Sequence, residues 1–162
     1  MKLKFFTIGV YGVKEIEFFK ALISHNIDVF CDIRLRRGMR GPKYAFANSK
    51  YLQAKLASLG IRYFHFKELA PTKAIRDEQK QADKNKAVKK RDRQTLSPEF
   101  IHAYESKILS DFNSAEFINK LGDNAERVVL FCVEHEPDAC HRSLAAKRLA
   151  KDLNIQVEHI IP

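Results

Sequence analysis

Short apolar runs alternate with segments of helical periodicity along most of the chain. Five runs are typical of buried strands, at 3–8, 27–33, 61–66, 128–133 and 156–160. Between them, apolar spacing predicts helices at 15–24, about 49–59, from 98, at 114–121 and about 140–153. Strands that alternate with helices in this way are typical of a parallel sheet covered on both faces. The sequence therefore predicts one α/β domain over residues 1–162, a three-layer sandwich of about five mostly parallel strands.

The segment from Ala70 to Leu96 breaks this alternation. It is polar and highly charged, it has Pro71 near its start, and it offers few apolar side chains for burial. We expect an excursion that contains some helix, is partly mobile and lies over the carboxyl edge of the sheet.

The composition is that of an ordinary globular protein, with 45% apolar and 30% charged residues among 162. No apolar run approaches the roughly 18 residues that a membrane-spanning helix needs, and the apolar start of the chain does not resemble a signal peptide. Three cysteines, an odd number, do not suggest a disulfide framework. We expect a cytoplasmic protein with free thiols and no membrane partner.

The formal net charge of +9 is concentrated in two segments. Nine Lys or Arg between Lys73 and Gln94 face four acids, and a second group of cations lies between Arg34 and Lys43. Grouped cations predict an anionic small molecule or a nucleic acid as partner. A solvated, highly charged insertion is the alternative for the longer segment.

The segment 128–142 carries the most chemistry. Cys132, Glu134, Cys140, His141 and Arg142 cluster around one predicted strand-to-helix turn. In open α/β sheets ligands bind at such turns, and the amino end of a helix suits an anion. Arg142 would oppose the dipole of the following helix, so helix stability gives no reason for it. These residues indicate a binding site.

Polar residues also end the other predicted strands. Because parallel strands place their carboxyl ends at one edge, we expect a shared site there. For binding an anion or substrate we assign the residues at this edge: Thr7, Gly9, Arg34, Arg37, Tyr63, His65, His141 and Arg142.

Three residues are candidates for catalysis. Asp32 and Glu134, from different strands, could divide general acid and base work. For Asp32 the alternative is a structural pair with Arg34, because a buried carboxylate needs a partner. Cys140 could be a nucleophile whose thiolate is stabilised by the helix start, or a small semi-buried side chain.

The residue types also allow a zinc site built from Cys132, Cys140 and His141 with His135 or His65. The donors come mainly from one turn and no C-x-x-C pair accompanies them. We therefore assign no metal ligand and leave the cofactor open. A Walker-type phosphate loop and a G-x-G-x-x-G fingerprint are both missing from the sequence, so standard nucleotide cofactors are not indicated.

Several of these motifs together resemble a bacterial and archaeal family called domain of unknown function 488. The matching segments are Thr7-Ile8-Gly9, Asp32-Ile33-Arg34, the block from Leu52 to Tyr63, Phe131-Cys132-Val133-Glu134 followed by Cys140-His141-Arg142, and His159-Ile160. The resemblance implies an α/β sandwich with Rossmann-like layering and implies no particular reaction. Many members carry a Pro and a Ser soon after the Asp-x-Arg; here residues 35–42 are arginine-rich. This branch is expected to take a more anionic ligand.

Two functions follow from these observations. The preferred hypothesis is an enzyme, a hydrolase or transferase with paired carboxylates, that acts on a phosphate-bearing ligand, a nucleotide or a nucleic acid. The alternative is a non-catalytic nucleic-acid-binding module that uses the basic segments 34–43 and 73–93.

Overall fold

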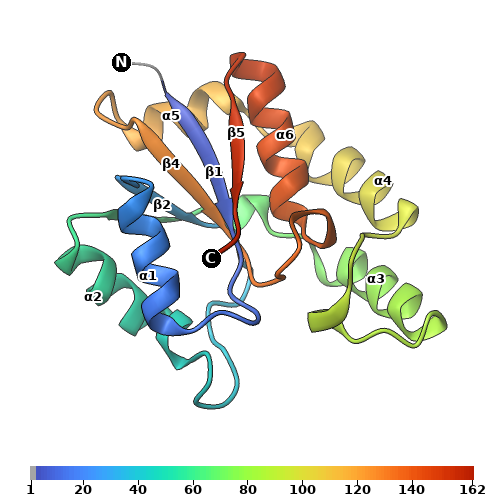
Figure 1. Ribbon diagram of the computed structural model, residues 1–162. Helices are drawn as coiled ribbons and strands as arrows, with labels where there is room; N and C mark the ends of the chain where they lie inside the picture. Colours follow the sequence, from blue (N-terminus) through green and yellow to red (C-terminus); the bar gives the residue numbers. More distant parts are fainter. Residues whose placement is uncertain (1–2) are drawn as a thin grey trace.

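The computed structural model of the protein describes residues 3–162. Its centre is a parallel sheet of five strands in the order β3-β2-β4-β1-β5 (Figure 1). The strands are β1 (Lys4–Ile8), β2 (Val29–Asp32), β3 (Arg62–His65), β4 (Arg127–Phe131) and β5 (Val157–Ile160). The predicted parallel α/β class is confirmed. Each strand is shorter than its apolar run, because buried residues such as Ile33 and Phe66 lie beyond the ladder.

Six helices accompany the sheet within the described residues. They are α1 (Glu15–Ser24), α2 (Ser49–Ser58), α3 (Lys73–Asn85), α4 (Pro98–Lys107), α5 (Ser114–Leu121) and α6 (His141–Leu153). The start of α4 is as predicted: the Ser97 hydroxyl accepts from the Phe100 N–H, and Pro98 occupies the first turn, where its missing N–H costs nothing.

The helices cover both faces of the sheet, which confirms the three-layer arrangement. Phe18 of α1 packs against Phe30 and Phe131 on one face. On the opposite face, Phe117 of α5 packs against Phe5. Figure 1 shows α1 and α2 on one side of the sheet and α4 and α6 on the other.

The strand order fixes where a ligand site can form. β1 and β4 are neighbours, but the helices that follow them, α1 and α6, lie on opposite faces (Figure 1). The connections that leave these two strands therefore run to opposite faces, after the contacts of Val10 and Tyr11 with the Val133 carbonyl. This is the topological switch point at which doubly wound folds bind ligands.

The charged excursion contains the expected helix, α3, followed by a single turn at Lys90–Asp92. It is attached to the body through Ile75 and Gln79, both buried, and the Gln79 side-chain oxygen accepts from the Ser97 N–H at 2.8 Å. None of the helices within residues 3–162 combines the length and apolar character needed to span a membrane.

Candidate functional site

A cavity of about 700 Å³ opens at the carboxyl edge, beside the ends of β2 and β4. Its walls come from Tyr11 after β1, the loop 34–44 after β2, the segment 132–134 after β4, and the charged excursion. The volume falls in the range of about 300–1,000 Å³ that is usual for small-molecule sites. The cavity therefore lies over the ends of β2 and β4, next to the switch point between β4 and β1, with Tyr11 as its contribution from the β1 side.

The lining of the cavity is strongly basic. Nine Lys or Arg line it, against two acids, Asp83 and Glu134. The nine cations are Arg34, Arg36, Arg40, Lys43, Arg76, Lys80, Lys90, Arg91 and Arg93. The two basic segments that are separate in the sequence thus meet across a single cavity.

Asp32 at the end of β2 is fully buried and holds Arg34. Arg34 donates from Nε to Oδ1 at 2.9 Å and from Nη2 to Oδ2 at 2.8 Å, and its backbone N–H also bonds Oδ1. The Tyr63 hydroxyl donates to Oδ2 at 2.7 Å. With both oxygens occupied and no place in the cavity lining, Asp32 is the structural partner of Arg34. This arrangement matches the structural pair with Arg34 that the sequence allowed as the alternative to an acid or base role.

Arg34 is buried, yet it lines the cavity. Its guanidinium lies 4.7 Å from the centre of the Phe131 ring, which stabilises a cation electrostatically. Nη1 is buried and has no hydrogen-bond partner among the described residues. Two of the side-chain nitrogens are thus fixed by Asp32, while the third is left without an acceptor.

Three further predicted site residues support Arg34 and do not line the cavity. Arg37 donates to the Tyr63 hydroxyl at 3.4 Å, and the His65 Nε2 donates to the Arg34 carbonyl at 2.7 Å. Burial, and next the charge of Asp32, raise the pKa of Tyr63 to about 12. Tyr63 therefore remains a hydroxyl donor to Asp32 at neutral pH.

Glu134, just beyond β4, lines the cavity, and only one of its two carboxylate oxygens has a hydrogen-bond partner among the described residues. Oε1 accepts from Arg93 Nη2 at 2.9 Å and lies 3.7 Å from Lys90 Nζ. Oε2 is buried and has no partner within the described residues. Burial and next the charge of Cys140 raise the pKa of Glu134, against the opposing pull of Lys90 and Arg93.

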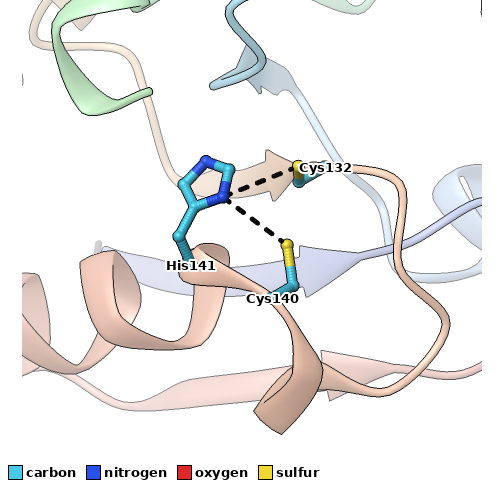
Figure 2. Close-up of side chains that lie close together, drawn as sticks. All are labelled: Cys132, Cys140 and His141. Carbon is cyan, nitrogen blue, oxygen red and sulfur yellow. Dashed lines mark hydrogen bonds between the residues drawn. The ribbon is translucent and has the colours of Figure 1, made fainter. Parts of the chain in front are cut away.

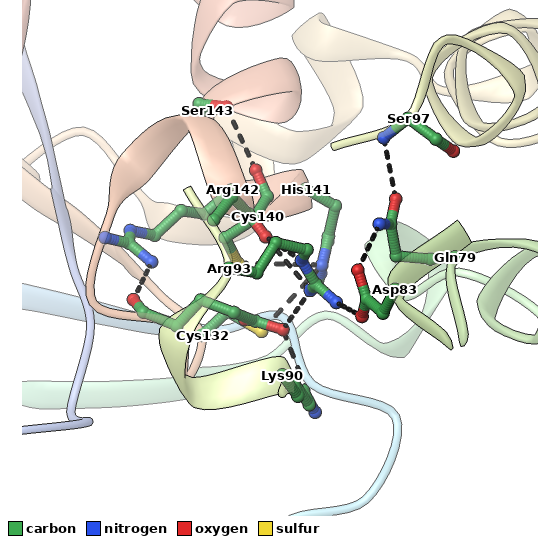
Figure 3. Close-up of polar contacts among 12 residues, drawn as sticks. Gln79, Asp83, Lys90, Arg93, Ser97, Cys132, Cys140, His141, Arg142 and Ser143 are labelled. Carbon is green, nitrogen blue, oxygen red and sulfur yellow. Dashed lines mark hydrogen bonds and ion pairs between the residues drawn. The ribbon is translucent and has the colours of Figure 1, made fainter. Parts of the chain in front are cut away.

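Arg93 is the residue of this site that the sequence did not single out. Besides Glu134, it donates to Asp83 at 2.7 Å and to the Ala139 carbonyl. It links the excursion to the turn before α6 (Figure 3). In the sequence Arg93 is one of nine cations in a polar run, and no local signal separates it from the others.

Cys132, Cys140 and His141 form a compact buried cluster (Figure 2). Their two sulfurs and one ring nitrogen all lie within 4.8 Å of one another. His141 Nδ1 is 3.8 Å from Cys132 Sγ and 3.9 Å from Cys140 Sγ. The structure thus brings together three residues of the types that bind zinc, without His135 or His65.

The two thiols differ in acidity and in position. The hydrogen bond with Cys140, together with burial, raises the pKa of Cys132 well above its usual range. Burial also raises the pKa of Cys140, but the Cys132 hydrogen bond and the neighbouring His141 outweigh it, so the pKa lies well below its usual range. Cys140 is only 1% exposed and is not part of the cavity wall. Of the cluster, Cys132 and His141 border the cavity.

Arg142, which we expected to bind an anion or substrate, does not line the cavity. It is fully buried and donates to the backbone carbonyls of Glu134 and His135, so it braces the turn between β4 and α6 and lies outside the cavity lining. Gly9 serves the same turn, because a Cβ there would overlap the carbonyl oxygen of Glu134. Thr7 is buried and hydrogen-bonds His159 at 2.6 Å, away from the cavity wall.

Comparison with known proteins identifies the family. Neither the curated proteins nor the solved structures contain a match to this chain. The model of the family described as Domain of unknown function DUF488 matches residues 15–149. This match spans α1 to α6, including Asp32, Arg34, Glu134 and the cysteine–histidine cluster. Because it covers most of the 162 residues, the chain belongs to the Domain of unknown function DUF488 family.

Proposed function

We propose that this protein is an enzyme that acts on a phosphate-bearing ligand bound in the basic cavity at the carboxyl edge of the sheet. The observation that carries the proposal is Arg34, which is buried in the cavity wall with Nη1 unpartnered among the described residues. A buried donor without an acceptor is energetically costly. A phosphate oxygen is the type of acceptor that removes this cost with a short, charge-assisted hydrogen bond.

The charge around the cavity supports an anionic ligand. Six of the lining cations have no carboxylate within salt-bridge distance in residues 3–162: Arg36, Arg40, Lys43, Arg76, Lys80 and Arg91. Cations gathered in a concave, low-dielectric site raise the local concentration of anions. Among the lining cations, Asp32 and Glu134 form ion pairs only with Arg34, Lys90 and Arg93.

Glu134 is the group best placed for proton transfer. It shares the cavity with Arg34, and its Oε2 is free to accept a hydrogen bond. In a hydrolytic reaction Glu134 takes a proton from the attacking water and returns it to the leaving group, which is general base and then general acid catalysis. Because Asp32 is fully engaged by Arg34, this proposal uses one catalytic carboxylate where the sequence had suggested two.

A nucleic-acid-binding module is the second candidate, since both basic segments contribute to the cavity and Arg36, Arg40 and Lys43 are exposed at its edge. Binding a nucleic-acid backbone requires contact with many phosphates along an extended surface. A concave site of about 700 Å³ with unpartnered buried groups fits a single small ligand better.

The binding experiment compares two double variants of equal charge. Arg40→Gln with Arg91→Gln removes two exposed cations from the cavity wall, while Lys20→Gln with Lys50→Gln removes two exposed cations of α1 and α2 outside it. Calorimetry with pyrophosphate, adenosine triphosphate and a short single-stranded oligonucleotide measures each affinity. We expect the cavity pair to weaken binding of the small ligand by about tenfold or more and the control pair to leave it unchanged.

Equal losses in the two double variants would mean that only the net charge matters, and the cavity proposal would fail. Tight binding of the oligonucleotide alone, with a steep dependence on salt, would favour the nucleic-acid-binding module. Turnover is then followed with whichever small ligand binds. We expect Glu134→Gln to retain binding but to lower turnover by about 100-fold or more. A wild-type protein that binds the ligand and never converts it would contradict the enzyme proposal.

A further inference from the structure

We infer that Cys132, Cys140 and His141 bind one zinc ion, with the fourth coordination position open to the cavity. We refer to these three residues as the zinc cluster. The assignment goes beyond the proposed phosphate-ligand activity and does not depend on it, because metal binding is measured without any phosphate ligand. It follows from the separation of the donor atoms, from the hydrogen bond that orients the imidazole, and from the position of the cluster beside the cavity.

The two nitrogen-to-sulfur separations are already close to those around a tetrahedral zinc ion, and all three donor atoms lie within 4.8 Å of one another. With Zn–S near 2.3 Å and Zn–N near 2.0 Å, a sulfur and a nitrogen ligand lie roughly 3.6 Å apart. In this protein Nδ1 of His141 lies 3.8 Å from Cys132 Sγ and 3.9 Å from Cys140 Sγ. These two separations exceed the zinc-bound spacing by only about 0.2–0.3 Å, and Figure 2 shows the imidazole nitrogen in contact with both sulfurs.

The imidazole is held in the orientation that a metal ligand needs. Its Nε2 lies 3.0 Å from the Ile33 carbonyl oxygen. Since a carbonyl oxygen can only accept, Nε2 carries the proton and Nδ1 is the ring nitrogen that faces the two sulfurs. Metal-binding histidines almost always donate their other ring N–H to a carboxylate, carbonyl or water in this way.

The backbone presents the two sulfurs from rigid positions. Cys132 follows β4, and its N–H donates to the Ile8 carbonyl of the adjacent strand. Cys140 immediately precedes α6 in extended conformation. Both side chains are buried, at 5% and 1% exposed. The donor set is therefore preorganised, so binding costs little conformational entropy.

One side of the zinc cluster faces the cavity. Cys132 and His141 line it together with Glu134, whose unpartnered Oε2 lies outside the group of three ligand atoms. Three protein ligands with a vacant fourth position are typical of catalytic zinc, which holds a water or a substrate atom there. Two thiolates neutralise the charge of Zn²⁺, so the ion does not add to the positive charge of the cavity.

A disulfide between Cys132 and Cys140 is the competing use of the two thiols. It requires the sulfurs at about 2.05 Å, whereas here both sulfurs contact the same ring nitrogen, an arrangement that suits a shared ion.

The third cysteine of the chain provides a matched control for substitutions in the zinc cluster. Cys31 on β2 is also fully buried but lies outside the zinc cluster.

The test is titration of the full, reduced chain with Zn²⁺ alone, against a chromophoric chelator. We expect one ion per chain in the wild type. Cys132→Ala, Cys140→Ala and His141→Ala should each weaken binding by more than about 100-fold, because each removes a direct ligand. Cys31→Ala should bind as the wild type does. Equal loss in Cys31→Ala, or no loss in the other three, would overturn the assignment.

A variant could lose zinc because it misfolds. Measurements on the folded wild type and on Glu134→Gln keep the assignment testable in that case. Co²⁺ added to the wild type should give the thiolate-to-metal charge-transfer band and the intense visible bands of a tetrahedral site. A wild-type chain without these bands, or one that yields only a Cys132–Cys140 disulfide, would contradict the assignment. Adding azide should shift the visible bands if the fourth position is open. Glu134→Gln should keep the metal; loss of the metal there would mean that Glu134 closes the site.

Discussion

The ends of β2 and β4 each carry a buried carboxylate, and the protein uses the two very differently. Asp32 accepts hydrogen bonds at both oxygens, from Arg34 and Tyr63, and has no share in the cavity. Glu134 is bonded at one oxygen and lines the cavity with the other unpartnered in the described structure. Burial therefore does not separate the two carboxylates. The unpartnered oxygen does, and it is the reason why we propose Glu134 as the catalytic one.

The variant expected to separate the two carboxylates most clearly is Asp32→Asn. We expect it to lower the free energy of unfolding by about 3–5 kcal/mol, because the buried guanidinium of Arg34 loses its charged partner. Urea denaturation followed by circular dichroism measures the loss. A loss below that of Glu134→Gln would show that the pair at the end of β2 is not structural.

A large effect is also expected from Gly9→Ala, which tests how the end of β4 is positioned. The added Cβ would overlap the Glu134 carbonyl oxygen and lie 3.2 Å from Arg142 Nη1. Since the overlapping atom belongs to the backbone, it cannot move aside as a flexible side chain could. We expect a loss of about 3 kcal/mol in the same assay.

Gly41→Ala is the control for Gly9→Ala. The backbone at Gly41 favours glycine, with φ +77°, but no atom lies within 4 Å of the position that an added Cβ would take. Its substitution should cost about 1 kcal/mol, from backbone strain alone. Losses of the same size at the two glycines would contradict the tight approach of Gly9, after β1, to Glu134.

Tyr63→Phe should cost about 1.5 kcal/mol at neutral pH, because it removes a hydrogen bond to the charged Asp32. The effect also depends on pH. With a pKa of about 12 in the folded protein against 10.0 ordinarily, the stabilisation of the neutral hydroxyl is fully present below pH 10. It is lost as the pH rises towards 12.

The stability of the wild type should therefore approach that of Tyr63→Phe between these two pH values. Unfolding curves of both proteins across this interval measure the convergence, and the tyrosinate absorbance reports which group ionises. A constant difference up to pH 12 would mean that Tyr63 does not titrate with a raised pKa.

The smallest loss of stability is expected for Glu134→Gln, about 1 kcal/mol. Arg93 keeps its bonds to Asp83 and to the Ala139 carbonyl, so no buried cation is left without a partner. The comparison with Asp32→Asn is direct, because each variant changes one carboxylate to an amide of the same shape. If Glu134→Gln were the more damaging of the two, the open oxygen would not mark the functional residue.

Much of the fold was predictable because each element satisfies local rules. The helix α4 begins at Pro98 and α5 at Ser114, as the apolar spacing indicated. The strand ends were less accurate, since the apolar runs continue into buried turns such as Ile33. The order of the strands was not predictable, because it depends on packing between segments far apart in the chain.

The sequence predicted the edge of the sheet at which the candidate site lies. It did not predict which residue of that edge has which contacts. Parallel strands place their carboxyl ends together by construction, so residues as distant as Arg34 and Glu134 line one cavity. Asp-x-Arg and Cys-His-Arg look alike as charged motifs. Yet Arg34 keeps Nη1 unpartnered in the cavity wall, while Arg142 lies outside the cavity, donates from both Nη atoms to backbone carbonyls and leaves only its buried Nε without a partner in the described chain. Hydrogen-bond satisfaction of this kind is a three-dimensional property.

The sequence by itself determined the α/β class, the edge at which polar side chains gather and the basic character of the segments that line the cavity, because periodicity, strand direction and charge are local or additive properties. Tertiary structure decided the rest. Only the strand order placed the ends of β2 and β4 side by side, where the cavity opens, and only the packing of α6 on the sheet brought Cys140 and His141 to Cys132. Which atoms are left without a partner depends on every nearby segment at once, so no single stretch of the chain encodes it.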